Sequence, residues 1–144
     1  MKGTVRMRHA TRGMTLIELL AVIIILGILT TIAVPSYRAY LIRSQRTEAR
    51  TSLLQVQAAQ EKFYLQNNAY TNNMTALGVP ATSDTGLYTI AVPTLGAAGQ
   101  SYTATATPVT GGSQAADTKC TQLSVTDTGV RGATGSGGVA QCWR

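Results

Sequence analysis

Residues 12–37 read RGMTLIELLAVIIILGILTTIAVPSY, a short basic and glycine-containing entry followed by an apolar run. No charged residue occurs from Leu19 to Tyr37. At about 1.5 Å per residue these positions would form a helix of roughly 28 Å, close to the hydrocarbon thickness of a bilayer. The run is therefore predicted to be a helix that can span a membrane.

The rest of the 144-residue chain leaves room for one small globular unit. Hydrophobic residues make up 44% of the sequence, but much of that content lies within residues 14–34, so the core of the remainder must be small. The formal charge of +6 comes from 12 basic and 6 acidic residues, and four basic residues precede the apolar run: Lys2, Arg6, Arg8 and Arg12. Without them 8 basic residues face 6 acidic ones, so the total charge is a weak argument for a nucleic-acid partner.

An ordinary secretory signal peptide is an alternative interpretation of the same run. The basic leader would be its n-region, residues 19–29 its h-region and residues 31–33 (TIA) a poor cleavage site, so that the mature chain would begin at Val34. Two features oppose this interpretation. Glu18 lies at the edge of the apolar run, and a helix-compatible pattern continues beyond Pro35.

Glu18 is an acidic residue at the start of a predicted membrane helix. A carboxylate in a membrane segment is costly and by default indicates a function that needs a partner. The residues alone leave a second interpretation open. In it, Glu18 lies in the first helical turn, near free backbone N–H groups and the positive end of the helix dipole.

The segment from Arg12 to Leu20, RGMTLIELL, resembles the prepilin processing motif of type IVa pilins, and the apolar run with Pro35 fits the same family. The resemblance implies that a prepilin peptidase cleaves after Gly13 and methylates the new amine of Met14. The leader, residues 1–13, would then be absent from the filament. The family usually has phenylalanine at the position of Met14, a departure that is tolerable because the position needs mainly an apolar side chain.

The same resemblance implies a partner for Glu18 and two positions at which the helix is weakened. It pairs Glu18 with the positively charged amine of Met14 on a neighbouring subunit, an attraction that grows inside an apolar filament core. Gly27 and Pro35 weaken a helix, so a kink is the minimal expectation. In assembled filaments of related pilins the matching stretch loses regular helix, which implies an extended segment from Gly27 to Pro35 in the fibre.

A second, amphipathic stretch of helix follows the apolar run. Its apolar positions recur at steps of four, three, three and four residues: Ala49, Leu53, Val56, Ala59 and Phe63. This helix is predicted to continue to about Gln66 and to pack beneath a sheet. Arg43, Arg46 and Arg50 share a helical face that is predicted to stay solvated, with contact to DNA phosphates as the alternative.

Three later segments have the composition of β-strands: residues 87–92, 102–107 and 120–126. The connections between them are rich in Gly, Ser, Pro and Asp and are too short for crossover helices, so the sheet is predicted to be antiparallel. The predicted fold class is α+β. A long N-terminal helix, apolar in its first half and amphipathic in its second, would pack on a small antiparallel sheet.

Cys120 and Cys142 are the only cysteines. They enclose a polar, Gly-rich segment that could not order itself, which favours a disulfide and an oxidising compartment. Closing the loop of residues 120–142 gains on the order of 3 kcal/mol in the chain-entropy model. Trp143 is expected to cover the bridge or to pack on the sheet. These features and the YTATA pattern of residues 102–106 resemble PilE-like minor pilins.

No catalytic or metal site is expected. The only histidine, His9, belongs to the leader, so the mature chain cannot build a Ser-His-Asp or Cys-His site. Two cysteines alone cannot complete a zinc site. Asp117 and Asp127 lack the spacing of an EF-hand and are interpreted as turn residues. No cofactor is predicted, and the chain is interpreted as a substrate of enzymes and not as an enzyme.

The predicted organisation has four parts: a cleaved leader (1–13), a transmembrane and assembly helix (14–35), an amphipathic helix (36–66) and a β-sheet head (67–144). The predicted function is that of a structural, minor subunit of a type IV pilus, supporting pilus biogenesis, twitching motility and adhesion. The chain would pass from the bacterial inner membrane to the extracellular pilus. Its expected partners are other pilin subunits, the prepilin peptidase and the inner membrane.

The residues are compatible with two other functions. A DNA-binding competence pilin would present Lys119, Arg131 and Arg144 to DNA. A pseudopilin of a type II secretion system would share the N-terminal features, although major pseudopilins more often rely on a calcium site than on a C-terminal disulfide.

Overall fold

The computed structural model describes residues 13–144. Residues 1–12 lie outside this range, and with them the charged or titratable residues of the predicted leader: Lys2, Arg6, Arg8, His9 and Arg12. The chain forms two compact units, one ending at Arg38 and the other starting at Ala39. Helix α1, Leu16–Asn67, contributes to both.

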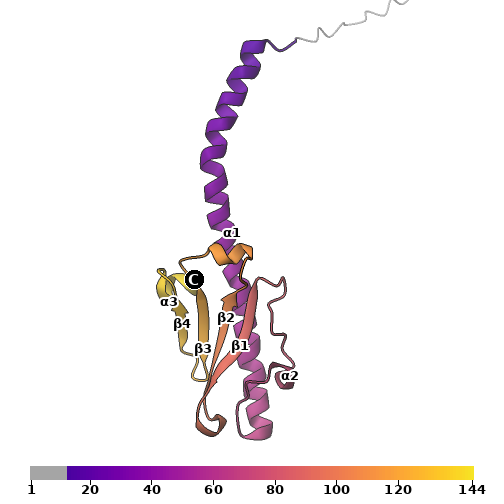
Figure 1. Ribbon diagram of the computed structural model, residues 1–144, viewed down its shortest axis with the longest axis vertical. Helices are drawn as coiled ribbons and strands as arrows, with labels where there is room; N and C mark the ends of the chain where they lie inside the picture. Colours follow the sequence, from indigo (N-terminus) through magenta and orange to yellow (C-terminus); the bar gives the residue numbers. More distant parts are fainter. Residues whose placement is uncertain (1–12) are drawn as a thin grey trace, which may run out of the picture. The chain divides into compact units, whose positions relative to one another are not determined.

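The first unit contains the apolar half of α1 (Figure 1). Its most apolar 18-residue window has a mean hydropathy of 2.7 and is unburied, so the helix is long and apolar enough to cross a membrane. The hydroxyls of Thr30, Thr31 and Ser36 donate to helix carbonyls three or four residues earlier, at 2.6 to 3.0 Å. Hydroxyls that are satisfied within the helix are compatible with a lipid environment.

Gly27 and Pro35 lie inside α1, which is continuous through both positions in the single chain. Pro35 has no N–H group to donate to the carbonyl four residues earlier, so the helix has one backbone hydrogen bond fewer there. The extended segment expected from Gly27 to Pro35 concerns the assembled fibre, and it stays a prediction.

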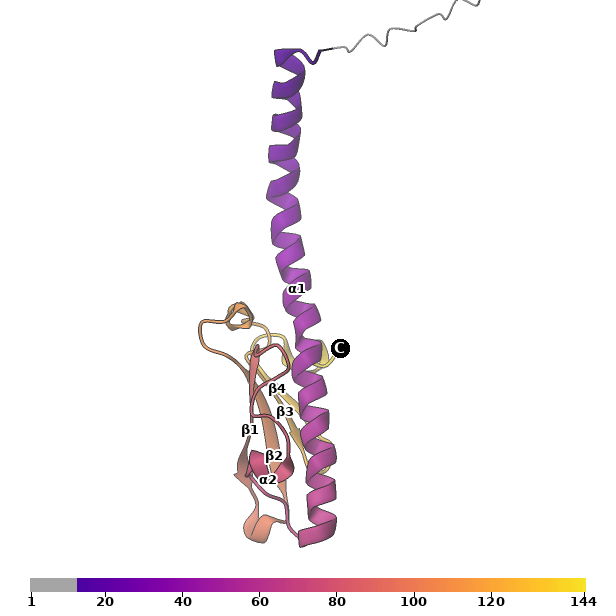
Figure 2. The ribbon, with the colours of Figure 1, turned by 90° about the vertical axis from the view of Figure 1, so that its right-hand side faces the viewer.

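The second unit is an α+β head, in which one antiparallel sheet lies against the second half of α1 (Figure 2). The sheet follows chain order: β1 Tyr88–Leu95, β2 Tyr102–Pro108, β3 Gln122–Thr126 and β4 Arg131–Thr134. The predicted fold class and the three predicted strands are confirmed. The end of α1 at Asn67 lies one residue beyond the predicted Gln66.

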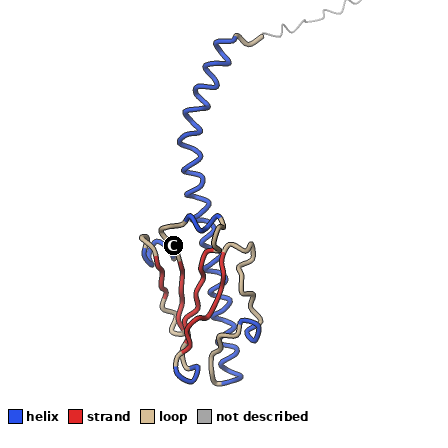
Figure 3. Tube along the Cα trace, viewed as in Figure 1, coloured by secondary structure: helices blue, strands red, loops and turns tan. Residues whose placement is uncertain are grey.

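Strand β4 completes the sheet and is not among the predicted strands (Figure 3). The segment Arg131–Thr134 reads RGAT and lacks the alternation typical of a strand. It is placed by the turn after β3, where Gly129 has a φ of 75°, and by pairing that sets Ala133 opposite Leu123. The Gly-rich segment between the cysteines is therefore partly ordered by the sheet as well as by the disulfide.

The core of the head lies between α1 and the inner face of the sheet. Ala49, Leu53 and Val56 are fully buried, as the helical spacing predicts. Ala59 and Phe63 are only half-buried, so the predicted stripe is less deeply packed at its C-terminal end. The strands contribute the side chains that point inward: Tyr88, Ile90, Val92, Tyr102, Ala104, Ala106, Leu123 and Val125.

The segments outside the strands of the head contain four short helices: α2 Met74–Leu77, η1 Ala97–Gly99, η2 Ser113–Ala116 and α3 Gly138–Cys142. The chain that leaves α1 is held by the buried Gln60. Its amide donates to the carbonyl of Thr71 at 2.5 Å and accepts from the N–H of Thr71 at 3.1 Å. Helix α1 thus fixes the segment that leads to α2.

Candidate functional site

The first candidate site is the beginning of α1. Gly13 and Met14 precede the helix and are exposed. The N–H of Glu18 donates to the hydroxyl of Thr15 at 3.3 Å, and the Glu18 carboxylate accepts from the N–H of Thr15 at 3.5 Å. This reciprocal pair is a capping box, in which two free donors of the first turn are satisfied. Glu18 therefore occupies the first-turn position, and its negative charge lies at the positive end of the helix dipole.

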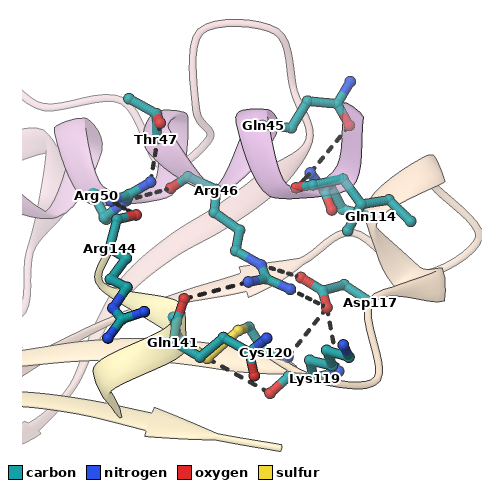
Figure 4. Close-up of polar contacts among 12 residues, drawn as sticks. Gln45, Arg46, Thr47, Arg50, Gln114, Asp117, Lys119, Cys120, Gln141 and Arg144 are labelled. Carbon is teal, nitrogen blue, oxygen red and sulfur yellow. Dashed lines mark hydrogen bonds and ion pairs between the residues drawn. A yellow bond between two sulfur atoms is a disulfide. The ribbon is translucent and has the colours of Figure 1, made fainter. Parts of the chain in front are cut away.

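The second candidate site lies in the head, where α1 meets the segment around the disulfide (Figure 4). The Arg46 guanidinium binds the Asp117 carboxylate through two hydrogen bonds, Nε to Oδ2 at 2.7 Å and Nη2 to Oδ1 at 2.9 Å. Both side chains are at least 95% buried. Asp117 also accepts from the N–H groups of Lys119 and Cys120, each at 3.2 Å. The pair therefore ties α1 to the loop that carries Cys120.

Two expectations about this pair need correction. Arg46 is predicted to be solvated with Arg43 and Arg50, which is wrong, because it is buried and paired. Asp117 does accept backbone N–H groups as a turn residue would, but its main partner is a buried cation. The spacing contained a signal for Arg46, since it lies three residues before Ala49 on the stripe that packs against the sheet.

The disulfide between Cys120 and Cys142 joins the segment before β3 to α3, as predicted. Trp143 follows it and donates its Nε1–H to the carbonyl of Gly132 at 2.9 Å. Of the two expectations for Trp143, packing on the sheet is therefore the one observed, at the edge strand β4.

Three arginines gather around Trp143, and we call these four residues the Arg50 group: Arg50, Arg131, Trp143 and Arg144. The Arg131 guanidinium carbon lies 5.0 Å from the centre of the Trp143 ring. The Arg50 guanidinium donates to the carbonyl of Arg144 and, at 3.0 Å, to the hydroxyl of Thr47. Arg50, Arg131 and Trp143 line a shallow cavity of about 260 Å³ with residues of α1.

No side-chain carboxylate within residues 13–144 forms an ion pair with the Arg50 group. Burial lowers the pKa of Arg50, and repulsion from Arg46 and Arg131 lowers it further. The carboxylate of Asp117 is already held by Arg46. The acidic Glu48 is also engaged, because its carboxylate accepts from the N–H and the hydroxyl of Thr85 at 2.7 and 2.6 Å. This face of the head therefore presents a positive field.

Lys119 lies in a different cavity. This cavity, which we call the Arg43 cavity, has a volume of about 150 Å³ and is lined by Arg43, Arg46, Asp117 and Lys119, among others. The structure therefore brings two of the three cations predicted for DNA together, Arg131 and Arg144, and adds Arg50 to them.

Two family models match the chain. The model described as "Type IV minor pilin ComP, DNA uptake sequence receptor" matches residues 35–124. The model described as "Prokaryotic N-terminal methylation motif" matches residues 8–34. The first covers more than half of the chain, and together the two models cover both the apolar segment and most of the head.

Curated relatives and a solved structure agree with these models. The chain is 37% identical over 73 residues to a type IV major pilin protein PilA of Myxococcus xanthus, a match covering 51% of this chain and 33% of that protein. It is 37% identical over 78 residues to a fimbrial protein of Neisseria meningitidis, covering 54% of this chain and 46% of that protein. The matches thus span half or less of these relatives.

The crystal structure of the Neisseria meningitidis non-core minor pilin PilV superposes with a TM-score of 0.53. The superposition covers 67% of this chain and 89% of PilV at 18% identity, so it shows a common fold.

Proposed function

The chain belongs to the type IV minor pilin family, and on that premise we propose that it is a minor subunit of a type IV pilus. The subunit is made as an inner-membrane precursor, cleaved after Gly13 and methylated on Met14. It then enters an extracellular filament that supports twitching motility and adhesion. The observation that carries this proposal is the exposed apolar half of α1, which begins with the capping box of Thr15 and Glu18 and continues into a folded head.

Within the filament, Glu18 pairs with the amine of Met14 on a neighbouring subunit. This assignment is supported by the exposure of Glu18 at the start of α1, where a neighbouring chain end can reach its carboxylate. Gly27 and Pro35 provide the positions where helix can be lost on assembly. The C-terminal disulfide and the matches to pilus proteins favour a pilus subunit over a pseudopilin.

Mass spectrometry of sheared surface filaments tests this proposal. We expect a subunit whose mass starts at Met14, carries one added methyl group and contains the Cys120–Cys142 disulfide. We also expect it at low abundance relative to the other pilins. A mature chain that begins at Val34, with the apolar helix discarded, would contradict the proposal.

DNA capture by the head is a second candidate function. It is favoured by the family model, whose description names a DNA uptake sequence receptor, and by the three arginines gathered in the Arg50 group. Guanidinium groups suit phosphates, and Trp143 adds an aromatic surface beside them.

Filter binding of duplex DNA to the detergent-solubilised chain tests the second candidate. We expect binding that weakens as salt rises, because each phosphate contact releases counterions. The variant Arg131→Gln should flatten the salt slope by about 1, whereas Lys62→Gln, which removes a cation outside both cavities, should not change it. Binding that does not depend on salt, or equal slopes for the two variants, would exclude the Arg50 group as the DNA site.

A further inference from the structure

We propose that the Arg43 cavity binds the phosphate of an anionic phospholipid headgroup while the subunit is still in the membrane. This inference rests on the proposed function, because a lipid ligand requires that the apolar half of α1 lies in a bilayer. It adds to that function a specific lipid partner for the head.

The cavity has the chemistry of an anion site. Arg43 and Lys119 line it, are exposed, and make no ion pair or side-chain hydrogen bond within residues 13–144. Asp117 does not cancel them, because its carboxylate is held by Arg46 and by two backbone N–H groups. Two cations without partners on one concave surface attract an anion, and a phosphate offers each of them an oxygen.

The cavity is also partly apolar. Ala39 and Ile42 line it from α1, beside the basic residues. A headgroup phosphate brings a glycerol backbone and the beginning of two acyl chains with it, and these can lie against such a wall. A free inorganic phosphate has no apolar atoms that could pack against this wall.

Chain length alone keeps Arg43 within reach of the lipid headgroups. The uncharged run ends at Tyr37, and Arg43 follows six residues later in the same helix, so their backbones are at most about 9 Å apart along the helix axis. The headgroup layer of one leaflet is roughly 5 to 8 Å thick. The Arg43 side chain can extend back over the remaining distance. Tyr37 and Tyr40 are 64% and 66% exposed, as expected for aromatic residues at a membrane interface.

The size of the cavity separates lipid from DNA as its ligand. A concave volume of about 150 Å³ accommodates one phosphate and its glycerol, whereas a duplex presents a row of phosphates that needs an extended basic surface. The Arg50 group, with three arginines beside an aromatic ring, is better suited to DNA. The two ligands are therefore assigned to different cations.

Native mass spectrometry of the full chain in nanodiscs tests this inference. The discs contain equal amounts of phosphatidylcholine and phosphatidylglycerol, and the readout is the lipid that remains bound after release. We expect the chain to retain phosphatidylglycerol in preference to phosphatidylcholine. In the double variant Arg43→Gln/Lys119→Gln, the ratio of bound phosphatidylglycerol to bound phosphatidylcholine should fall by about 30-fold, since two cations that contact the phosphate are removed.

Arg38→Gln is the matched control, because Arg38 is a cation at the same membrane surface that does not line the cavity. It should keep the preference. An equal loss in Arg38→Gln and in the double variant would overturn the site in favour of diffuse attraction. Displacement of the bound lipid by millimolar inorganic phosphate or by a duplex oligonucleotide would overturn the lipid assignment.

Failure of the proposed function gives a separate result in the same experiment. If the chain does not enter the nanodiscs at all, the proposal of a membrane-inserted precursor is wrong, and the proposed lipid site is then wrong as well. If the chain enters the discs but retains both lipids equally, the precursor stands and only the lipid site is overturned.

Discussion

Replacing Arg46 with methionine should lower the free energy of unfolding by about 3 to 5 kcal/mol, the cost of leaving a buried carboxylate without its cation. Methionine keeps most of the aliphatic volume of the side chain, so the decrease in the free energy of unfolding measures the loss of charge more than the loss of packing. Asp117 would retain only the N–H groups of Lys119 and Cys120 as donors. Denaturant unfolding of the detergent-solubilised chain, followed by the fluorescence of Trp143, the single tryptophan, measures the change.

Two controls separate the ion pair from a general effect of removing an arginine. Arg43→Met removes an exposed guanidinium three residues earlier on the same helix and should change stability by no more than about 0.5 kcal/mol. The double variant Arg46→Met/Asp117→Asn should be more stable than Arg46→Met alone, because asparagine removes the buried charge and still accepts from the backbone. Equal losses in Arg46→Met and Arg43→Met would show that the pair does not stabilise the head.

Local patterns in the sequence were sufficient for the framework of the fold. The apolar run from Leu19 to Tyr37 and the steps between Ala49, Leu53 and Val56 depend only on neighbours within a few turns of helix, so α1 and its buried face could be predicted. The strands with alternating side chains could be predicted for the same reason. The capping box of Thr15 and Glu18 has a local spacing of three positions, but it was recognised only in the structure.

Features that depend on distant partners could not be predicted in this way. Arg46 and Asp117 are 71 positions apart, and neither residue alone indicates that the other neutralises it. Helical spacing placed Arg46 on the buried stripe, but an arginine can be buried there only because the fold supplies the Asp117 carboxylate. Strand β4 was likewise determined by pairing with β3 and not by its own composition.

The distribution of charge on the head also depends on residues that are distant in the sequence. The net charge of the head is small, and nothing in the local sequence places Arg50 beside Arg144, which is 94 positions away. The disulfide and the Arg46–Asp117 pair bring the C-terminal segment onto α1, and this contact concentrates positive charge on one face of the head. The surface proposed to bind DNA was thus created by contacts that are themselves structural.

Replacing Glu18 with alanine should reduce the amount of subunit in sheared filaments by at least about tenfold while leaving its amount in the membrane unchanged. In the proposed filament the carboxylate neutralises the amine of Met14 on a neighbouring chain, and a charge left unpaired in an apolar core is strongly unfavourable. Insertion into the membrane depends on the apolar run, which the substitution does not shorten. Quantitative immunoblots of the filament and membrane fractions measure both amounts.

The capping box makes a sharper test possible, because Glu18 has two roles that different variants separate. Glu18→Gln keeps a side chain that can bond to the N–H of Thr15 but removes the charge, since glutamine also serves in a capping box. Thr15→Ala keeps the charge but removes the hydroxyl that accepts from the N–H of Glu18. If intersubunit pairing is the main role, Glu18→Gln should fail to assemble like Glu18→Ala, and Thr15→Ala should assemble nearly as well as the unaltered chain. The reverse order would assign Glu18 to the stability of its own helix, and the proposed pairing with Met14 would be wrong.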